Sequence, residues 1–456
     1  MFKVAIVGGG VAGATAALYL SKLGVDITIF EQRSSLISGP PFCHLHAGGN
    51  LYPQISDEER LTLLRQSIDL VHYYPFAIDY RPTVVTIPKE DSTDPAYLLQ
   101  KLSFVQRHYE ELVKKDPSNA LLGDPKEYFK LYKKSDLHNL EVLDPWMKAV
   151  AKYIDLDRLK EPLAIVQEFG LNIFALSGAL NQILRKIPNV HLKLNTKVLE
   201  IKETYTLTYE TDGHIHQESF DFLINAAGFA TGWIDRMLGF SRKRYVEFKA
   251  AYVARWDESP GGFPEIIFHG KRGTDKGMAQ FTPYGGNLFQ LHYMSKKATL
   301  FEDGLVSGDP YPELHRKFLE LIESDWADGE YEERTKAAIE RIATFIPSFK
   351  SAKPAAKPLF GAQQIPGDNP ELRAADVSFE GETYARCEIV KASSVLDMSE
   401  AIAKRLYELG AVKEYKKKRD LSHLQAIDTR LAASIAKERG YPLELAKILY
   451  PNNSLP

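Results

Sequence analysis

The pattern that most restricts the fold of this chain lies at its N-terminus. The β-branched run VAIV at residues 4–7 leads directly into GGGVAG, and a helical pattern of alanines and leucines follows. We therefore expect a strand, a tight turn and a helix. In such a turn Gly8 permits the bend, Gly10 leaves room for a pyrophosphate, and Gly13 lets the helix approach the strand closely. The phosphates would bind the free amides at the helix N-terminus, around Val11 and Ala12.

A carboxylate follows the second predicted strand, where a dinucleotide would place a ribose. The apolar run at residues 25–30 ends at Glu31, about 20 residues after the glycines. A carboxylate at this position suits hydrogen bonds to ribose hydroxyls and would repel a 2′-phosphate. The sequence therefore predicts a bound dinucleotide other than NADP, and Gln32 and Arg33 complete this part of the predicted site.

Composition limits the other function classes. The chain has 456 residues, enough for two or three domains, and a formal net charge of −3, which gives no support to a nucleic-acid partner. Its two cysteines, Cys43 and Cys387, are too few for a disulfide framework, so we expect a cytoplasmic protein. We find no metal-binding spacing, no signal peptide and no apolar run of about 20 residues, and therefore expect no metal and no membrane-spanning helix.

Beyond Glu31 the chain departs from a nicotinamide-binding domain. A loop rich in Gly, Pro and His precedes a predicted helix at residues 57–73, and alternating β patterns begin at residue 190. An apolar strand at residues 222–224 then ends in small residues. Two separated strand-to-glycine elements around a β meander are typical of a glutathione-reductase-type flavin domain. In that arrangement Val198 lies against the adenine, and Ala227 and Gly228 allow close backbone approach to the dinucleotide.

This pattern resembles the D-amino-acid oxidase-like superfamily of FAD-dependent oxidoreductases, over most of the chain to about Gly410. Within it, CHLHAGGNLY is similar to the His-Ala-Gly segment of 2-hydroxyglutarate dehydrogenases and their relatives. The resemblance implies an α/β fold that binds FAD. It also implies oxidation of a small carboxylate, a 2-hydroxy acid or an amino acid, by hydride transfer to flavin N5. Oxygen or a quinone-like acceptor would then reoxidise the flavin.

The same resemblance implies an interleaved domain order. Residues 1–53, 150–240 and 350–410 would form the FAD-binding domain, with a helical and strand insertion at 54–149 and a β-rich α+β substrate domain at 241–349. Residues 411–456 read as a solvated helical extension whose basic face offers the alternative of peripheral membrane contact. The chain departs from the family where Ser393 and Ser394 replace usual glycines near the flavin, and where FGAQQIPGDNP replaces an Arg-Pro segment.

Several side chains are candidates for the chemistry. His46 and His44 are the preferred bases, because they lie in the loop expected beside the flavin and histidine transfers protons near neutral pH. Residues His46, Ala47 and Gly48 are also expected to contact the cofactor, and His46 is a candidate for a covalent flavin link. The alternative is that loop carbonyls satisfy both histidines.

The substrate side offers cations and aromatic residues. Arg81, in the predicted strand DYRPT, could clamp a carboxylate, or else be an exposed edge-strand arginine. From the predicted hairpin GMAQFTPYGGNLFQLHYM, residues 277–294, we select Tyr284 and His292, with His292 favoured. Arg272 and Lys391 are further cation candidates, for which surface solvation is the default.

Other functions remain open at this point. The sequence does not separate a hydroxy acid from an amino acid, although the histidine pair leans towards the former. Rab GDP-dissociation inhibitors show that this fold can serve as a non-catalytic binding protein, but the glycines and Glu31 are intact here. A monooxygenase or an RNA-modifying enzyme is a further alternative. The chain lacks a second complete GxGxxG for a separate nicotinamide domain and a strongly basic signature for RNA.

Overall fold

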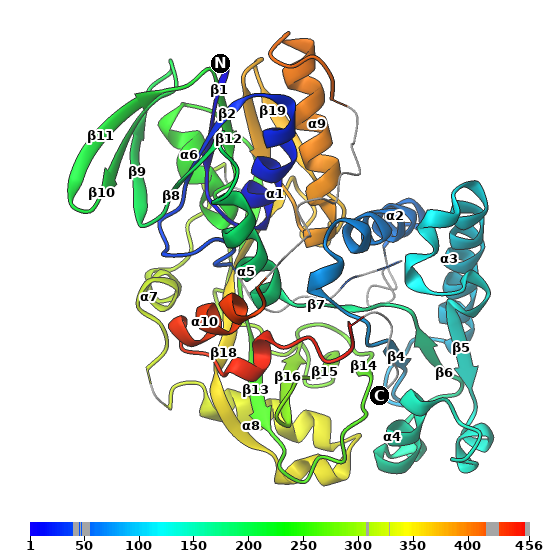
Figure 1. Cartoon of the computed structure of the whole chain (residues 1–456). Helices are drawn as coiled ribbons and strands as arrows, with labels where there is room; N and C mark the ends of the chain where they lie inside the picture. Colours follow the sequence, from blue (N-terminus) through cyan, green and yellow to red (C-terminus); the bar gives the residue numbers. More distant parts are fainter. Residues whose placement is uncertain are drawn as a thin grey trace.

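The computed structural model describes residues 1–39, 45, 47, 55–306, 310–327, 329–415 and 428–451. Two large sheets organise these residues (Figure 1). The first sheet has the strand order β19-β20-β12-β1-β2-β8, and all neighbouring strands in it are parallel except β19 and β20. Its strands are β1 (Lys3–Val7), β2 (Asp26–Phe30), β8 (Val190–Lys193), β12 (Phe222–Asn225), β19 (Val377–Glu380) and β20 (Tyr384–Cys387).

Both faces of the first sheet are buried, because each carries apolar side chains on alternate positions. On one face, Val4 and Ile6 join a core with the helices α1 (Val11–Leu20), α5 (Ile173–Leu184) and α9 (Val395–Glu408). On the other face, Ala5 and Val7 join a core with α6 (Thr231–Met237) and a three-stranded meander. The meander strands are β9 (Thr196–Ile201), β10 (Thr206–Thr211) and β11 (His214–Ser219). These layers match the predicted flavin-type α/β fold.

The second sheet follows the order β17-β13-β16-β15-β14-β4-β6-β5, and β18 pairs with β13. Its strands are β4 (Thr83–Thr86), β5 (Phe129–Tyr132), β6 (Leu163–Val166), β13 (Arg244–Arg255), β14 (Glu265–Phe268), β15 (Ala279–Pro283), β16 (Leu288–Tyr293), β17 (Leu305–Val306) and β18 (Lys353–Pro366). One face packs on α4 (Pro145–Tyr153) and α8 (Glu332–Ala343). Phe268 and Phe345 stack there with ring centroids 4.3 Å apart. The opposite face is turned towards the first sheet.

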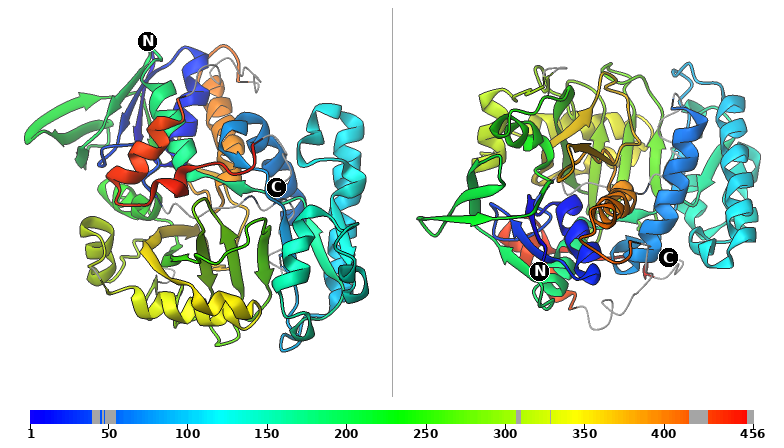
Figure 2. Two further views of the ribbon diagram at one scale, coloured as in Figure 1. Left: turned by 60° about the horizontal axis from the view of Figure 1, so that its bottom comes forward. Right: turned by 90° about the horizontal axis from the view of Figure 1, so that it is seen from above.

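The remaining elements surround these sheets (Figures 1 and 2). The helices α2 (Asp57–Tyr73) and α3 (Pro95–Lys115) lie to one side, α7 (Arg316–Ser324) precedes α8, and β3 (Ile78–Asp79) pairs with β7 (Gly170–Leu171). The predicted helix at residues 57–73 is confirmed, and the Ser56 side chain caps it by accepting a hydrogen bond from the Glu59 amide. Among the described ranges, no helix combines the length and apolarity needed to cross a membrane.

Three local predictions were wrong. The sequence LNIFALSGALNQILRKI at residues 171–187 predicts a strand that leads into a helix capped by Ser177. In the structure α5 begins earlier and Asn172 caps it, because the Asn172 side chain accepts the Ala175 amide at 2.9 Å. Ser177 lies inside α5 and donates to the Leu36 carbonyl at 2.6 Å. Arg81 lies in the link between β3 and β4 and not in a strand.

The third difference concerns the C-terminal residues, which are not a solvated extension where the structure describes them. The helix α10 (Arg430–Glu438) buries Ala432, Ile435 and Ala436, and it packs against α5 (Figure 2). A Cβ atom at Gly178 of α5 would lie 2.7 Å from the Ala432 amide nitrogen, so only glycine permits this approach. We use the name C-terminal strap for residues 428–451.

Candidate active site

The glycine turn has the geometry of a dinucleotide cradle. Gly8 has a φ of +102°, and a Cβ there would lie 2.3 Å from the Ala226 carbonyl oxygen. A Cβ at Gly13 would lie 2.0 Å from the Gly8 carbonyl oxygen. Gly10 is different, because a Cβ there would meet no described atom within 4 Å. Gly8 and Gly13 therefore allow close packing inside the turn, whereas no described atom fills the space beside Gly10.

The helix α1 presents an anion-binding end to this open side. Gly10 is its N-cap, no side chain caps it, and no acidic residue lies in its first turn. The first amides of an α-helix have no partner within the helix, and they carry the positive end of the helix dipole. The amides of Val11, Ala12 and Gly13 occupy these positions. The space beside Gly10 and these helix amides, which have no partner within the helix, together suit the pyrophosphate of a dinucleotide.

Glu31 connects the end of β2 to this turn. It is buried, and its Oε2 accepts the Gly9 amide at 2.8 Å while its Oε1 accepts the Arg33 amide at 2.8 Å. Burial raises the pKa of Glu31, and the two amide hydrogen bonds oppose that rise. Gln32 beside it is exposed, and the Arg33 guanidinium donates to the carbonyl of Ile322 in α7. The predicted ribose contact of Glu31 stays a prediction.

The other predicted dinucleotide contacts lie around the same sheet edge. Ala227 and Gly228 follow β12, and Gly228 has a φ of +60° with no described atom near a Cβ built on it. The Asn225 side chain fixes this turn by donating to the Thr231 carbonyl at 2.9 Å and to the Tyr384 hydroxyl at 2.7 Å. Val198 is half-buried in β9 of the meander.

The predicted flavin loop is only partly described. His44, His46 and Gly48 lie outside the described residues, so their predicted roles and the His-Ala-Gly resemblance stay predictions. Ala47 is buried, and its carbonyl accepts the Tyr128 hydroxyl. Ser393 and Ser394 are buried just before α9, as expected for a turn leading into that helix. The Ser394 hydroxyl donates to Gln66 of α2 at 3.1 Å.

The second sheet presents polar side chains on the face that is turned towards the first sheet. Register places them together, since Thr282 pairs with Gln290 and Gln280 pairs with His292. The same face carries Ala251, which shares a buried cluster with Phe174 of α5. We call the following set the polar wall: Glu247 and Lys249 of β13, Glu265 of β14, Gln280 and Thr282 of β15, and Gln290 and His292 of β16.

Arg81 lies at one end of the polar wall, enclosed by acids. Its guanidinium donates to Asp79 at 3.1 Å, to Glu265 at 3.1 Å and to the Pro283 carbonyl at 3.0 Å. Arg81 is only 3% exposed. Burial raises the pKa of Asp79, while Arg81 opposes that rise. With two carboxylates around one guanidinium, this placement favours a structural role for Arg81 over a substrate clamp.

At the opposite end of the polar wall, two cations contact one buried carboxylate. Glu247 accepts from Lys249 at 2.7 Å, from Gln363 at 3.3 Å and from the Arg272 guanidinium. Burial alone would raise the pKa of Glu247, but Lys249 and Arg272 outweigh it and hold that pKa below its usual range. Glu371 lies beyond, 3.6 Å from Arg272 and 2.9 Å from Arg373. The Glu59 carboxylate of α2 also reaches this group, where it accepts the Arg373 amide at 3.1 Å.

Sequence reasoning selected Arg272 but missed Glu247 and Lys249. Their i, i+2 spacing in the sequence VEFKAAYV was the available signal, because alternate residues of a strand share a face. His292 lies on the same face, and the Tyr284 hydroxyl donates to Gln290 at 3.3 Å. Lys391 lies apart from the wall, just before the turn that starts α9.

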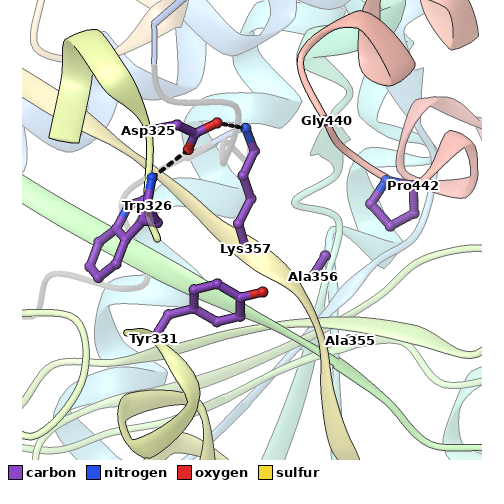
Figure 3. A pocket seen from close by; sticks show the side chains of 8 residues that line it. All are labelled: Asp325, Trp326, Tyr331, Ala355, Ala356, Lys357, Gly440 and Pro442. Atoms are coloured by element: carbon purple, nitrogen blue, oxygen red, sulfur yellow. Dashed lines mark hydrogen bonds and ion pairs between the residues drawn. The ribbon is translucent and has the colours of Figure 1, made fainter. Parts of the chain in front are cut away.

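A separate depression lies outside this arrangement (Figure 3). Its lining residues are Asp325, Trp326, Tyr331, Ala355, Ala356, Lys357, Gly440 and Pro442. The charges of Asp325 and Lys357 are paired with each other. The depression contains none of the residues predicted from the sequence, and we do not assign the active site to it.

Comparison with known proteins is consistent with this site. A model of the FAD dependent oxidoreductase family matches residues 3–358. Thiamine thiazole synthase from Pyrobaculum aerophilum is 36% identical over 104 residues, which are 22% of this chain and 32% of that protein. The match therefore spans about a third of the length of the curated relatives.

Solved structures show the same fold over nearly the whole chain. Glycine oxidase from Geobacillus kaustophilus has a TM-score of 0.56 and 15% identity, covering 94% of this chain and 99% of its own. L-α-glycerophosphate oxidase from Mycoplasma pneumoniae, solved with FAD bound, has a TM-score of 0.58 and 15% identity, covering 93% and 98%. At this identity, the two structures establish the fold and leave the substrate open.

Proposed function

The chain belongs to the family of FAD-dependent oxidoreductases, and we propose that it oxidises a small carboxylate that binds at the cationic end of the polar wall. When bound, FAD supplies the hydride acceptor for such an oxidation. The glycine turn, the α1 N-terminus and Glu31 would hold its ADP half. The second sheet supplies the groups that meet the substrate, a 2-hydroxy acid or an amino acid.

The observation that carries the proposal is the charge distribution along the polar wall. Lys249 and Arg272 both contact one buried carboxylate, Glu247, and Arg272 also lies 3.6 Å from Glu371. Arg81 at the other end is outnumbered by Asp79 and Glu265. A substrate carboxylate entering between the sheets would be attracted to Lys249 and Arg272 and repelled from the acids near Arg81.

The polar wall also offers groups for proton transfer and orientation. His292 lies opposite Gln280 on β15, on the face that carries Lys249. A histidine there can accept the proton of a substrate hydroxyl or ammonium near neutral pH. Gln290, which accepts from Tyr284 at 3.3 Å, can orient the same group. The names of the two solved neighbours, an oxidase of glycine and one of α-glycerophosphate, support a small polar substrate.

The test is an anaerobic screen of the FAD-loaded protein, with loss of the oxidised flavin's visible absorbance as the signal. The panel contains 2-hydroxy acids, 2-amino acids and, for each acid, the amide in which a carboxamide replaces the carboxylate. We expect at least one acid to bleach the flavin and its amide to fail, because the amide cannot pair with Lys249 and Arg272. Equal bleaching by acid and amide would contradict the proposal, as would reduction only by uncharged compounds.

A further inference from the structure

The loop that follows Glu31 is strained and presses against the glycine turn. Ile37 has a φ of +58°, a conformation that is rare and strained for a β-branched residue. Its amide donates to the Gly9 carbonyl at 2.8 Å. The Leu36 side chain fills the space beside Gly9, where a Cβ would lie 2.6 Å from the Leu36 Cδ2. Such a backbone persists only where neighbouring groups hold it.

Arg439 of the C-terminal strap holds this loop. Its guanidinium donates to the Ile37 carbonyl at 2.8 Å, to the Leu36 carbonyl at 2.9 Å and to the Ser35 hydroxyl at 2.8 Å. A fourth contact, at 3.3 Å, joins it to the Ser177 hydroxyl of α5. A planar, five-donor guanidinium suits this set of oxygen atoms, whereas an ammonium does not.

Other contacts hold the C-terminal strap in place and thereby fix the position of Arg439. The Asn172 side chain donates to the Leu445 carbonyl at 3.0 Å and to the Lys447 carbonyl at 3.2 Å. The Lys357 ammonium lies 4.6 Å from the centre of the Tyr441 ring, beside the depression bordered by Gly440 and Pro442 (Figure 3). Further along, the Tyr450 amide donates to Asp79 at 3.1 Å, next to Arg81. The strap therefore reaches from the glycine turn to the polar wall.

We propose that Arg439 is a positioning residue for FAD. It holds residues 35–37 in the strained conformation that supports Gly9 and the end of β2, and FAD affinity therefore depends on a docked strap. The inference rests on the FAD cofactor of the family and not on the substrate proposed above. If the proposed substrate is wrong, the inference about Arg439 is unaffected, and the proposed substrate is equally unaffected if Arg439 has no role in FAD binding.

The test measures the dissociation constant of FAD for the deflavinated full-length chain, by fluorescence titration. Arg439→Gln should raise that constant about tenfold, a loss of about 1.4 kcal/mol. The matched control is Arg430→Gln at the opposite end of α10, because Arg430 is exposed and pairs only with Asp428 among the described residues. We expect the control to stay within about twofold of wild type. Equal affinities for wild type and Arg439→Gln would overturn the proposal.

A double-mutant cycle with Ile37→Gly tests the role of strain, since glycine adopts positive φ readily. Arg439→Gln should raise the FAD dissociation constant less in the Ile37→Gly background than in wild type. Equal fold-changes in both backgrounds would overturn the proposed mechanism. If Arg439→Gln does not fold, Arg439→Lys tests the proposal instead, because lysine keeps the positive charge but lacks the planar guanidinium with its several N–H donors. Arg439→Lys with normal apoprotein unfolding should bind FAD several-fold more weakly, and wild-type affinity would overturn the proposal.

Discussion

At the scale of single residues, neighbouring glycines in one turn have different roles. Gly8 and Gly13 lie where a methyl group would clash with backbone atoms, so both are needed for the close packing of the turn. Gly10 lies where a methyl group would meet no described atom, and its φ of −64° suits any residue. No described residue requires glycine at this position, and the space that a bound FAD pyrophosphate needs accounts for it. This distinction separates folding from binding within one short motif.

We therefore expect Gly10→Ala and Gly13→Ala to differ. Gly10→Ala should leave the free energy of unfolding of the apoprotein within about 0.5 kcal/mol of wild type and weaken FAD binding about tenfold or more. Gly13→Ala should destabilise the apoprotein by about 1–3 kcal/mol, because its Cβ would lie 2.0 Å from the Gly8 carbonyl oxygen. Urea unfolding of the apoproteins and FAD titration measure the two quantities. Equal destabilisation by both variants would contradict this assignment.

Glu247 makes a pH-dependent contribution to stability. Its folded-state pKa lies below the usual value, because Lys249 and Arg272 outweigh burial. Its stabilising contribution is therefore present above the unfolded pKa of about 4.3 and is lost as pH falls through the folded-state value. Glu247→Gln should lower the free energy of unfolding by about 1–3 kcal/mol at neutral pH. The difference from wild type in urea unfolding should be constant down to about pH 4.3 and shrink below it. A difference that grows on acidification would contradict the ion-pair assignment.

At the scale of elements, the contact between α5 and α10 shows what local sequence can and cannot reveal. Local signals predicted the helix at residues 57–73 and the strand-turn-helix around the glycines, because caps, apolar spacing and glycines act within a few residues. They misplaced the start of α5, where Ser177 resembled a cap while its hydroxyl in fact bonds Leu36. Close packing of α10 on Gly178 depends on a partner more than 250 residues away, and no local pattern encodes it.

Substitution at Gly178 tests this contact. Gly178→Leu should destabilise the protein by about 1–3 kcal/mol or more, because the first added carbon already lies 2.7 Å from the Ala432 amide nitrogen. The strap should then become the first site of limited proteolysis. Arg185→Leu, at the exposed end of the same helix, is the control and should leave the digestion pattern unchanged. An unchanged pattern for Gly178→Leu would contradict the docking of α10.

At the scale of the whole molecule, the FAD-type fold was predictable and the substrate side was not. The fold follows from motifs at the strand ends, which identify the parallel first sheet and the family. The polar wall is assembled from four strands, and its charge balance depends on register and on buried partners. The sequence left Arg81 as either a substrate clamp or an exposed edge-strand arginine, and it did not reveal that Arg81 is buried between Asp79 and Glu265. The predicted domain boundaries stay predictions.

The most direct test of the account is anaerobic stopped-flow reduction of the flavin by the best acid from the screen, comparing Lys249→Met with wild type. Lys271→Met is the control, because Lys271 is exposed beside Arg272. We expect Lys249→Met to raise the half-saturating substrate concentration about tenfold or more with little change in the limiting rate of reduction, since it removes binding of the substrate carboxylate. The control should match wild type. An unchanged half-saturating concentration for Lys249→Met would contradict the assignment of the substrate anion to this end of the polar wall.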